Sequence, residues 1–403
     1  MSRVVFVWEL GSSLSHVSHL LKLAKLLRAQ GHEVSMVVRE LHNLRNLAVE
    51  GVRVLQAPVW LPQVAGLPEP PLSYAEILLR FGYHNPANLG GLVDAWRDLY
   101  RILEPDLVVA NHAPTAMLAA RSLQIRTAVQ GGGFLVPPRE TPMPNMRPWI
   151  SVPPQRLAEA EAAVLGTVNT LLEGYGARRL AFLGELFDVA ETFLTTFPEL
   201  DHYPGRRGAS YRGPLFSSGS GAIVDWPAGE GPRVFGYLEP FARDFDAAML
   251  ALSRIKARAL ICAPGISSNA LEKWRGQGIK IATRPLNLDG LLGGCDFALT
   301  YCGHGIVAQL LLSGVPLLMF PDHLERFLTA WRVHLLGAGI IVNPEAAAPP
   351  LAPLMQALLK ESRYRQQAQA FAGRHAGFDV ATAEAGILRD IQRLIGDLPA
   401  ATG

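Results

Sequence analysis

The sequence predicts an α/β protein of two parallel-sheet domains, and three observations lead to this prediction. Short runs of β-branched and apolar residues alternate with longer segments of helical period. A strand, a helix and a second strand follow one another directly at the start of the chain, which implies a parallel sheet. The alternation stops in a Gly-, Ser- and Pro-rich stretch at residues 213–232 and then begins again. A chain of 403 residues is long enough for two separate cores.

The first half of the chain gives the clearest elements. Residues 4–7 form a continuous apolar run that is typical of a strand buried on both faces. Ser12, Ser13 and Ser15 offer capping oxygens to a helix whose leucines recur at helical spacing up to Leu27. Gly31 ends that helix, and residues 33–38 form the next strand. Further along we expect a strand at 106–110, a helix at 115–122 and a strand at 127–130.

The second half repeats the pattern. We expect strands at residues 233–236, 259–263, 279–282, 297–300 and 316–320, with helices between them. The last segment, 381–398, has an amphipathic helical pattern that needs a surface to cover. We therefore expect a first domain over residues 1–212, a linker over 213–232, a second domain over 233–378 and a final helix over 379–403.

Composition narrows the class of function. The chain is 49% hydrophobic and 18% charged, as in well-packed globular proteins, and its formal net charge of +2 argues against nucleic acid as the main partner. Cys262, Cys295 and Cys302 are odd in number and lack paired metal-type spacing, so we expect no disulfide framework and no zinc site. No signal peptide or transmembrane run is apparent. We expect a cytoplasmic monomer or homodimer, with peripheral membrane association left open.

The most informative turn lies between the strand that ends at Thr300 and the helix that runs to Ser313. Ligands bind at the carboxyl ends of the strands in open α/β sheets, where turns of this kind lie. Gly303 and Gly305 let the backbone approach a ligand, and unpartnered N–H groups at a helix start favour a phosphate. His304, held between the glycines, can donate a further hydrogen bond. A tight turn whose glycines only permit packing is the alternative.

The residues after this turn extend the pattern. The chain reads YCGHGIVAQLLLSGVP and then PDHLERFLTAWRVHLLGAG. This resembles the nucleotide-sugar glycosyltransferases of the UDP-glycosyltransferase and macrolide-glycosyltransferase superfamily, whose signature is HGGxGTxxEALxxGVP, a proline-led loop with DQ, then NAxR and GxG. The spacing is preserved without a gap from Tyr301 to Gly339. Near the N-terminus, His16 at the helix start and the sequence QGHEV at its end are similar to the same family's GHxxP and RGHEV.

The resemblance implies the GT-B fold: two Rossmann-like domains that face a cleft, with a C-terminal helix that crosses back to the N-terminal domain. It implies transfer of a sugar, with inversion, from a UDP- or dTDP-sugar to a hydroxyl of a small hydrophobic acceptor, as in natural-product or glycolipid biosynthesis. The nucleotide sugar is then a co-substrate, and no other cofactor and no metal is required. The acceptor is expected on the N-terminal domain, where residues 60–86 and 130–149 are predicted to form long Pro-rich and aromatic binding loops.

His16 occupies the position of the family's catalytic histidine and is the candidate general base. The aspartate that orients this histidine in many members is replaced by Asn111, which can hold an imidazole but cannot stabilise an imidazolium as a carboxylate does. Either His112 or a carboxylate elsewhere in the chain shares the task, or catalysis relies more on departure of the leaving group. Read without the family, His16 and His19 share one helix face and are either metal ligands or satisfied surface histidines.

The donor site departs from the family at several positions. Tyr301 replaces a diphosphate-binding histidine, Ile306 a threonine and Gln309 a ribose-binding glutamate. The sugar-contacting DQ pair becomes Glu325 and Arg326, where Arg326 fits an acidic sugar, a stronger diphosphate clamp or a solvent-facing charge pair. The resemblance thus implies donor contacts from Gly236, Tyr237, Leu286, Tyr301, Gly303, His304, Gly305, Ile306, Gln309, Glu325 and Arg326.

These departures keep two rival functions open. A non-catalytic member of the same fold would bind a nucleotide sugar or partner a second enzyme, and the changes at Asn111, Tyr301 and Ile306 favour it. A nucleotide-sugar epimerase would need a carboxylate-rich cleft instead of a histidine at the helix start, so it ranks lower.

Overall fold

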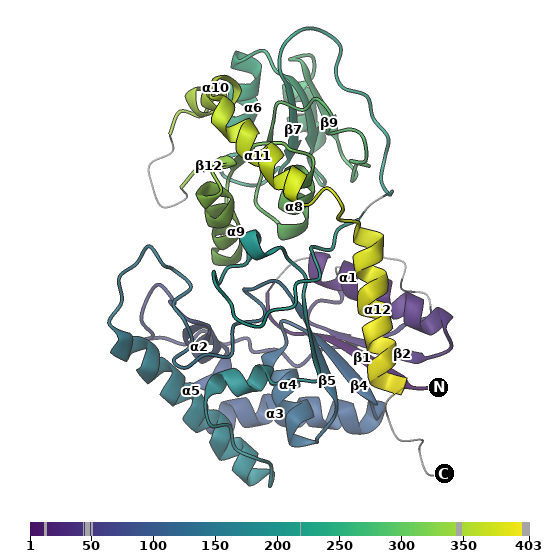
Figure 1. Cartoon of the computed structure of the whole chain (residues 1–403), viewed down its shortest axis with the longest axis vertical. Helices are drawn as coiled ribbons and strands as arrows, with labels where there is room; N and C mark the ends of the chain where they lie inside the picture. The colour runs from purple at the N-terminus through teal and green to yellow at the C-terminus, as the bar shows by residue number, and fades with distance from the viewer. Residues whose placement is uncertain are drawn as a thin grey trace. The chain divides into compact units, whose positions relative to one another are not determined.

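A computed structural model describes residues 1–11, 14–42, 44, 49, 51–217, 219–343 and 349–396 (Figure 1). The chain divides into two compact units. The first comprises residues 1–213 together with the chain from Ala381 onward, and the second comprises Pro214–Val380. Each unit contains one six-stranded sheet in which every pairing is parallel, so the predicted fold of two parallel-sheet domains is confirmed.

The sheet of the first unit has the strand order β3-β2-β1-β4-β5-β6. Its strands are β1 (Arg3–Trp8), β2 (Glu33–Val38), β3 (Arg53–Gln56), β4 (Leu107–Asn111), β5 (Thr127–Gly131) and β6 (Glu191–Leu194). Its helices are α1 (Leu14–Ala29), α2 (Tyr74–Leu78), α3 (Pro86–Leu103), α4 (Pro114–Ser122), α5 (Pro154–Gly174) and α12 (Val380–Gly396). The central strands β4 and β5 are buried throughout, which explains why β4 is a continuous apolar run up to Asn111 instead of an alternating one.

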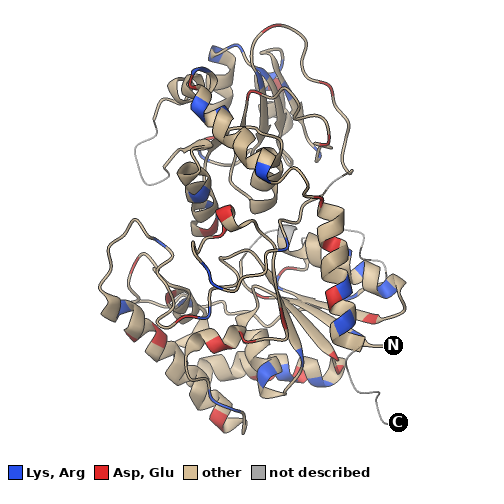
Figure 2. Cartoon of the chain, in the orientation of Figure 1, with Lys and Arg blue, Asp and Glu red and all other residues tan. Residues whose placement is uncertain are grey.

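The sheet of the second unit has the order β12-β11-β10-β7-β8-β9. Its strands are β7 (Arg233–Tyr237), β8 (Arg258–Cys262), β9 (Ile279–Ala282), β10 (Phe297–Thr300), β11 (Leu317–Met319) and β12 (Gly339–Ile341). Its helices are α6 (Phe245–Arg254), α7 (Ser268–Trp274), α8 (His304–Leu312), α9 (Leu324–Leu335), α10 (Leu351–Lys360) and α11 (Ser362–Arg374). Charged residues are spread along the helices, whereas the strands carry few of them (Figure 2).

The sequence analysis missed some elements and misjudged one. The strands β3, β6 and β12 are only three or four residues long and were not predicted. Residues 60–86 were predicted to be a loop, but this was wrong from Tyr74 onward: α2 and a π-helical turn at Leu79–Tyr83 follow. Ser73 caps α2 by accepting a hydrogen bond from the Glu76 amide. The predicted capping residues Ser12 and Ser13 and the side chain of Ser15 lie outside the described residues.

The last helix, α12, belongs to the first unit and lies beside α1 there (Figure 1). Glu384 pairs with Lys22 on α1, and Asp390 pairs with Arg212 at 2.7 Å. The apolar face of the helix is buried, with Ile387 and Ile391 inaccessible to solvent. The amphipathic pattern of residues 381–398 is thus matched by a surface within the first unit. In the described part of the chain, no helix is both long and apolar enough to cross a membrane.

Residues 213–232 lack helices and strands of their own, and part of this stretch packs on the second unit. Ala222 pairs with Leu286 in an isolated parallel bridge. The amide of Ala222 donates to the Pro285 carbonyl, and the amide of Asn287 donates back to the Ala222 carbonyl. The indole of Trp226 donates to the Leu291 carbonyl at 3.2 Å. These bonds fix the loop that contains Leu286.

A buried ion pair fixes the loops at one edge of the first sheet. The Asp201 carboxylate accepts hydrogen bonds from Nε of Arg206 at 2.8 Å and from the Tyr211 hydroxyl at 2.8 Å. Arg206 also donates to the Val136 carbonyl at 2.8 Å. Asp201 is fully buried and Arg206 is 7% exposed, so each charge depends on the other. A methyl group on Gly133 would lie 2.0 Å from the Asp201 carboxylate, so only glycine fits there.

Replacing this arginine should destabilise the first unit strongly. We expect Arg206→Met to lower the free energy of unfolding by about 3–5 kcal/mol, because it leaves the Asp201 carboxylate buried without a countercharge. Urea unfolding followed by tryptophan fluorescence measures the effect. The control Arg101→Met breaks an exposed pair with Asp98 and should change stability by less than about 1 kcal/mol. Equal midpoints for the two variants would contradict the prediction.

Candidate functional site

Each sheet reverses its strand order beside its first strand, and the predicted site residues gather there. In the first unit β1 has β2 on one side and β4 on the other, and in the second unit β7 has β8 and β10. Loops that leave the carboxyl ends at such a point diverge and leave room for a ligand. Trp8 pairs in register with Asn111, and Tyr237 pairs with Thr300. His16 follows the first of these pairs and the glycine turn follows the second.

The His16 imidazole is fixed by a hydrogen bond to Asn111. Its Nδ1 lies 2.7 Å from Oδ1 of Asn111, and Nδ2 of Asn111 donates to the Gln130 carbonyl at 3.1 Å. Because the Asn111 amide nitrogen is committed to Gln130, its oxygen must face His16, so Nδ1 of His16 carries the proton. The Trp8 indole stacks on the ring, with centroids 5.4 Å apart. These contacts leave Nε2 as the ring nitrogen that is available to accept a hydrogen bond.

Gly11 keeps the space in front of this nitrogen clear. A methyl group built on Gly11 would lie 3.3 Å from Nε2 of His16 and 3.5 Å from Nδ1 of His112. The backbone of Gly11 has a φ of +81°, which side-chain-bearing residues rarely adopt. The positive φ therefore favours glycine at this position, and glycine leaves the space beside the two ring nitrogens free of a side chain.

A buried carboxylate, Glu9, lies at the same strand end but does not bind His16. It accepts hydrogen bonds from the amides of Thr115 at 3.0 Å and Ala116 at 2.9 Å, the first turn of α4. Burial raises the pKa of Glu9 to about 7, although the hydrogen bonds from Thr115 and Ala116 oppose this shift. The carboxylate that the sequence analysis left open as a partner for His16 is therefore not Glu9, which instead fixes α4.

His112 is the second histidine of this site and occupies a strained backbone position. Its φ is +45°, and its carbonyl accepts a hydrogen bond from the Leu10 amide at 3.0 Å. Neither ring nitrogen has a hydrogen-bond partner among the described residues. Burial, followed by the nearby His16, lowers the pKa of His112 to about 3, so the ring is neutral at pH 7. It lies 6.4 Å from the His16 ring, too far for a direct hydrogen bond to be its main role.

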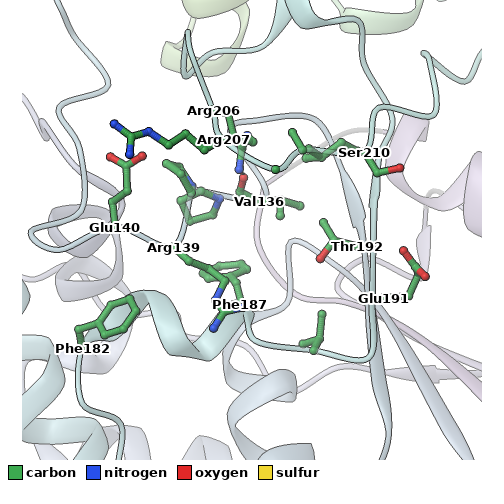
Figure 3. Close-up of a pocket in the computed structure, with 16 residues that line it drawn as sticks. Val136, Arg139, Glu140, Phe182, Phe187, Glu191, Thr192, Arg206, Arg207 and Ser210 are labelled. Atoms are coloured by element: carbon green, nitrogen blue, oxygen red, sulfur yellow. The ribbon is translucent and has the colours of Figure 1, made fainter.

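Aromatic rings extend from His112 to a pocket at the edge of the sheet. Tyr74 and Phe134 contact His112, at centroid distances of 6.1 and 5.6 Å, and Phe187 contacts Tyr74 at 5.6 Å. Phe187 in turn lines a cavity of about 770 Å³ (Figure 3). Its walls come from the segment after β5, from β6 and from residues 206–210. They combine apolar side chains with charged ones such as Arg139 and Glu140.

The glycine turn of the second unit starts helix α8. Gly303 is its capping residue, and the first intrahelical bond runs from the Val307 amide to the Gly303 carbonyl. The N–H groups of the first turn precede this bond, so they have no acceptor within the helix. Cys302, directly before the turn, has a φ of +66° and is buried. The remaining positions from Gly303 to Ile306 and Gln309 are half-buried, whereas Val307 and Ala308 face the core.

Three more predicted donor residues lie in β7 or in the loop after β9. Gly236 lies within β7, and a methyl group on it would be 2.6 Å from Cδ1 of Ile261, so a side chain there would clash with the core. Tyr237 ends β7 and its side chain is partly exposed. Leu286 is buried in the loop after β9 that is held by Ala222. Gly236 and Tyr237 therefore lie in the strand that pairs with β10, and the glycine turn directly follows β10.

Arg326 has partners that the sequence analysis did not foresee. Its guanidinium donates to Glu239 and to Asp322, both at 2.8 Å, instead of pairing with the neighbouring Glu325. Of the three interpretations left open for Arg326, the charge pair with Glu325 is therefore not the one that the structure shows. Tyr301 is 5% exposed, and its hydroxyl has no hydrogen-bond partner among the described residues. Burial raises the pKa of Tyr301 well above its usual value, so the hydroxyl stays protonated.

Several residues that shape these sites were missed. Glu9 is visible in the sequence as a charge that directly follows an apolar strand, which signals a strand end. Tyr74, Phe134 and Glu239 lie in segments with no motif, and only the fold brings them to the site. Within the described ranges, no group of three or more His, Cys, Asp or Glu side chains is placed to hold a metal ion.

The fold resembles that of solved glycosyltransferases. The chain is similar to the calicheamicin glycosyltransferase CalG4 (TM-score 0.71, 18% identity, 98% of this chain and 99% of that one). It is also similar to the glycosyltransferase SsfS6 of Streptomyces sp. SF2575 bound to thymidine diphosphate (0.65, 19%, 98% and 100%) and to VinC bound to dTDP (0.63, 18%, 98% and 99%). No protein-family model and no curated protein sequence matches the chain. These likenesses establish the GT-B fold that the sequence resemblance implied.

The buried His112 should make the protein sensitive to acid. Its folded-state pKa of about 3 lies below the ordinary 6.5, so the unfolded chain takes up a proton first as the pH falls. The contribution of the neutral His112 to the free energy of unfolding is present above pH 6.5 and is lost as the pH falls toward 3. Between pH 7 and pH 4.5 we expect wild type to lose roughly 3 kcal/mol more unfolding free energy than His112→Asn, because each pH unit in this range contributes about 1.4 kcal/mol.

Asparagine is chosen for this test because it tolerates a positive φ. Urea unfolding at several pH values measures the difference between wild type and His112→Asn. A difference that does not vary with pH would show that His112 is not buried in its neutral form.

Proposed function

We propose that the protein is a glycosyltransferase that moves a sugar, with inversion, from a UDP- or dTDP-sugar to a hydroxyl of a small hydrophobic acceptor. The observation that carries the proposal is the hydrogen bond between Nδ1 of His16 and Asn111, which leaves Nε2 as an acceptor beside the space that Gly11 keeps open. The glycine turn at α8 supplies the complementary feature, a helix start suited to a diphosphate. The GT-B fold and the dTDP bound to SsfS6 and VinC support it.

In this mechanism His16 acts on the acceptor. Nε2 takes the proton of the acceptor hydroxyl while that oxygen attacks the anomeric carbon of the donor. The bond between this carbon and the diphosphate oxygen breaks, and the diphosphate leaves with the electron pair. Attack from the face opposite the leaving group inverts the anomeric centre. The negative charge that develops on the diphosphate is stabilised by the amides at the start of α8 and needs no bound metal.

Asn111 positions the base in this scheme. It needs both an acceptor for His16 and a donor for the Gln130 carbonyl, and an amide provides both whereas a carboxylate does not. Asparagine keeps the reactive tautomer of His16 but adds no negative charge to stabilise the imidazolium. We therefore infer that a larger share of catalysis comes from departure of the diphosphate.

The acceptor belongs to the first unit in this proposal. The pocket of about 770 Å³ beside Phe187 is large enough for a drug-sized molecule, and its mixed lining suits a molecule with an apolar body and polar substituents. Residues 136–140, from the second predicted binding loop, form part of its wall (Figure 3).

A non-catalytic, nucleotide-sugar-binding protein is the second candidate. The absence of a carboxylate at Asn111 and the altered residues Tyr301 and Ile306 favour it. Both candidates require donor binding at the glycine turn, and only the first requires His16 for turnover. The two tests below therefore separate them.

Gly303 gives the sharper test of donor binding. Its φ is −57°, and a methyl group there would meet only Cγ2 of Ile306, at 3.7 Å, so Gly303→Ala should fold as wild type does. The same methyl group would stand at the start of α8, where the diphosphate is proposed to approach the backbone. We expect at least a tenfold loss of affinity for free UDP or dTDP, or about 1.4 kcal/mol, measured by calorimetry.

The control for this test is Gly166→Ala on α5, where a methyl group meets nothing within 4 Å. This variant should bind nucleotide as wild type does. Unchanged affinity in Gly303→Ala would remove the glycine turn as the diphosphate site.

Turnover should depend on His16. We expect His16→Ala to lower kcat at least a hundredfold, because general-base catalysis contributes about 10²–10⁴-fold, while the affinity for the nucleotide sugar stays within twofold. The measurement is sugar transfer to a library of hydrophobic alcohols and phenols. His32→Ala is the control, since His32 lies at the opposite, amino-terminal end of the strands beside the Ser2 amide. Equal rates in wild type and His16→Ala would exclude His16 as the base.

A further inference from the structure

The space beside Gly11 is bordered by two imidazole nitrogens. The methyl carbon of an alanine at this position would lie 3.3 Å from Nε2 of His16 and 3.5 Å from Nδ1 of His112. Outside the segment around Gly11, no other atom of the described residues comes within 4 Å of that point. Gly11 itself is exposed, so the space opens to solvent. A small polar group that entered it would therefore meet both nitrogens at once.

His112 brings an unused hydrogen-bonding nitrogen to this space. The residue is 4% exposed, and neither Nδ1 nor Nε2 has a hydrogen-bond partner in the part of the chain that the structure describes. A buried polar atom without a partner costs about 1–3 kcal/mol, and a bound polar group would relieve this cost. Since Nδ1 is the nitrogen that borders the space beside Gly11, a ligand there can reach it.

Packing and backbone geometry hold the His112 ring in this orientation. Phe134 meets the ring edge-on, with centroids 5.6 Å apart, and Tyr74 contacts it at 6.1 Å. The left-handed backbone at His112 is fixed by the hydrogen bond from the Leu10 amide to its carbonyl. A hydrogen-bonding group that is already oriented loses little freedom when a ligand binds, so its bond contributes more to binding and catalysis.

A hydroxyl oxygen fits the two nitrogens only if one of them accepts and the other donates. A hydroxyl has one proton to give, and its lone pairs accept. The hydrogen bond to Asn111 places the proton of His16 on Nδ1, so Nε2 of His16 accepts. Nδ1 of His112 must then carry a proton and donate. A neutral imidazole can serve in this way as a hydrogen-bond donor to a reacting oxygen.

A neutral His112 suits its place beside the base. Burial is the largest cause that lowers the pKa of His112 to about 3; His16 and Arg39 add to this shift, and the Leu10 backbone opposes it. When His16 takes a proton from the acceptor it becomes an imidazolium. The His112 ring lies 6.4 Å away, so a positive charge on it would oppose that step. In its neutral form His112 donates without this repulsion.

We propose that His112 is a second acceptor-binding histidine, whose Nδ1–H donates a hydrogen bond to the same oxygen that His16 deprotonates. The inference rests on the proposed function and adds a residue to its acceptor site. The hydroxyl gives its proton to Nε2 of His16, and His112 keeps its own proton throughout. The oxygen bonds to the anomeric carbon while the diphosphate leaves with the electron pair. The hydrogen bond from His112 orients the oxygen and stabilises the partial negative charge that develops on it.

Two substitutions at His112 separate hydrogen bonding from packing. His112→Phe keeps an aromatic ring against Tyr74 and Phe134 but has no N–H group. His112→Asn loses the ring, tolerates the positive φ and can place its amide nitrogen near the position of Nδ1. For transfer to hydrophobic phenols and alcohols at pH 7, we expect kcat to fall about tenfold or more in His112→Phe and less than about threefold in His112→Asn. If the ring only packs, His112→Phe will be the faster variant.

Two controls accompany these rates. Urea unfolding of both variants at pH 7 shows that the first unit is folded before the rates are compared. His32→Phe changes a histidine at the opposite end of the strands, beside the Ser2 amide, and should transfer sugar as wild type does.

The proton on Nδ1 can be measured directly in the wild-type protein. ¹⁵N NMR of histidine-labelled protein distinguishes protonated from unprotonated ring nitrogens, and the signals that are missing from His112→Asn assign the ring. At pH 7 we expect the proton of His112 on Nδ1, and added naphthol should shift this signal together with that of Nε2 of His16. A proton on Nε2 of His112 would overturn the inference, because the nitrogen beside Gly11 could then only accept.

The outcomes separate this inference from the proposed function. If His16→Ala abolishes transfer while His112→Phe keeps the wild-type kcat, or if His112→Phe is faster than His112→Asn, the role of His112 is wrong and the glycosyltransferase proposal stands. If the wild-type protein transfers no sugar to any acceptor, both proposals fall.

Discussion

Backbone pairing between the first and the fourth strand of each sheet determines where chemistry can occur in this protein. β1 pairs with β4, and the chain after β1 continues to β2 on one side of this pair while the chain after β4 continues to β5 on the other. β7 and β10 are paired in the same way, with β8 and β11 on their outer sides. The register places Asn111 directly opposite Trp8, which brings an amide to the helix that carries His16. The same geometry aligns the glycine turn with the end of β7.

Both fourth strands are followed by a residue with a left-handed backbone. His112 comes directly after β4, and Cys302 comes two residues after β10, with φ values of +45° and +66°. Such conformations cost about 1–3 kcal/mol each in residues other than glycine, and they persist where the surrounding structure fixes them. At both places a hydrogen bond from a backbone amide helps to fix the conformation: the Leu10 amide donates to the His112 carbonyl, and the Cys302 amide donates to the Thr300 hydroxyl.

Periodicity in the sequence predicts most of the fold because buried parallel strands are continuous apolar runs. The strands β3, β6 and β12 escaped because they are short edge strands that are only partly buried, so their sequences are not continuous apolar runs. In the site, spacing located His16, Asn111 and Gly303, which lie close to strand ends. Spacing did not reveal that Arg326 donates hydrogen bonds to Glu239 and Asp322, because these two carboxylates come from separate loops that only the sheet brings together. Local pattern thus predicts the candidate residues of a site, whereas their charge balance depends on tertiary structure.

The division of the chain into units also affects how the protein is made. The first unit contains residues from both halves of the gene product, since α12 packs against α1 and pairs with Arg212 only after the whole second unit has been synthesised. Domains usually fold as they emerge from the ribosome. Here the groove that receives Ile387 and Ile391 stays open to solvent during translation of Pro214–Val380. The nascent chain therefore exposes an apolar surface for many seconds, and it is in this interval that a chaperone would bind.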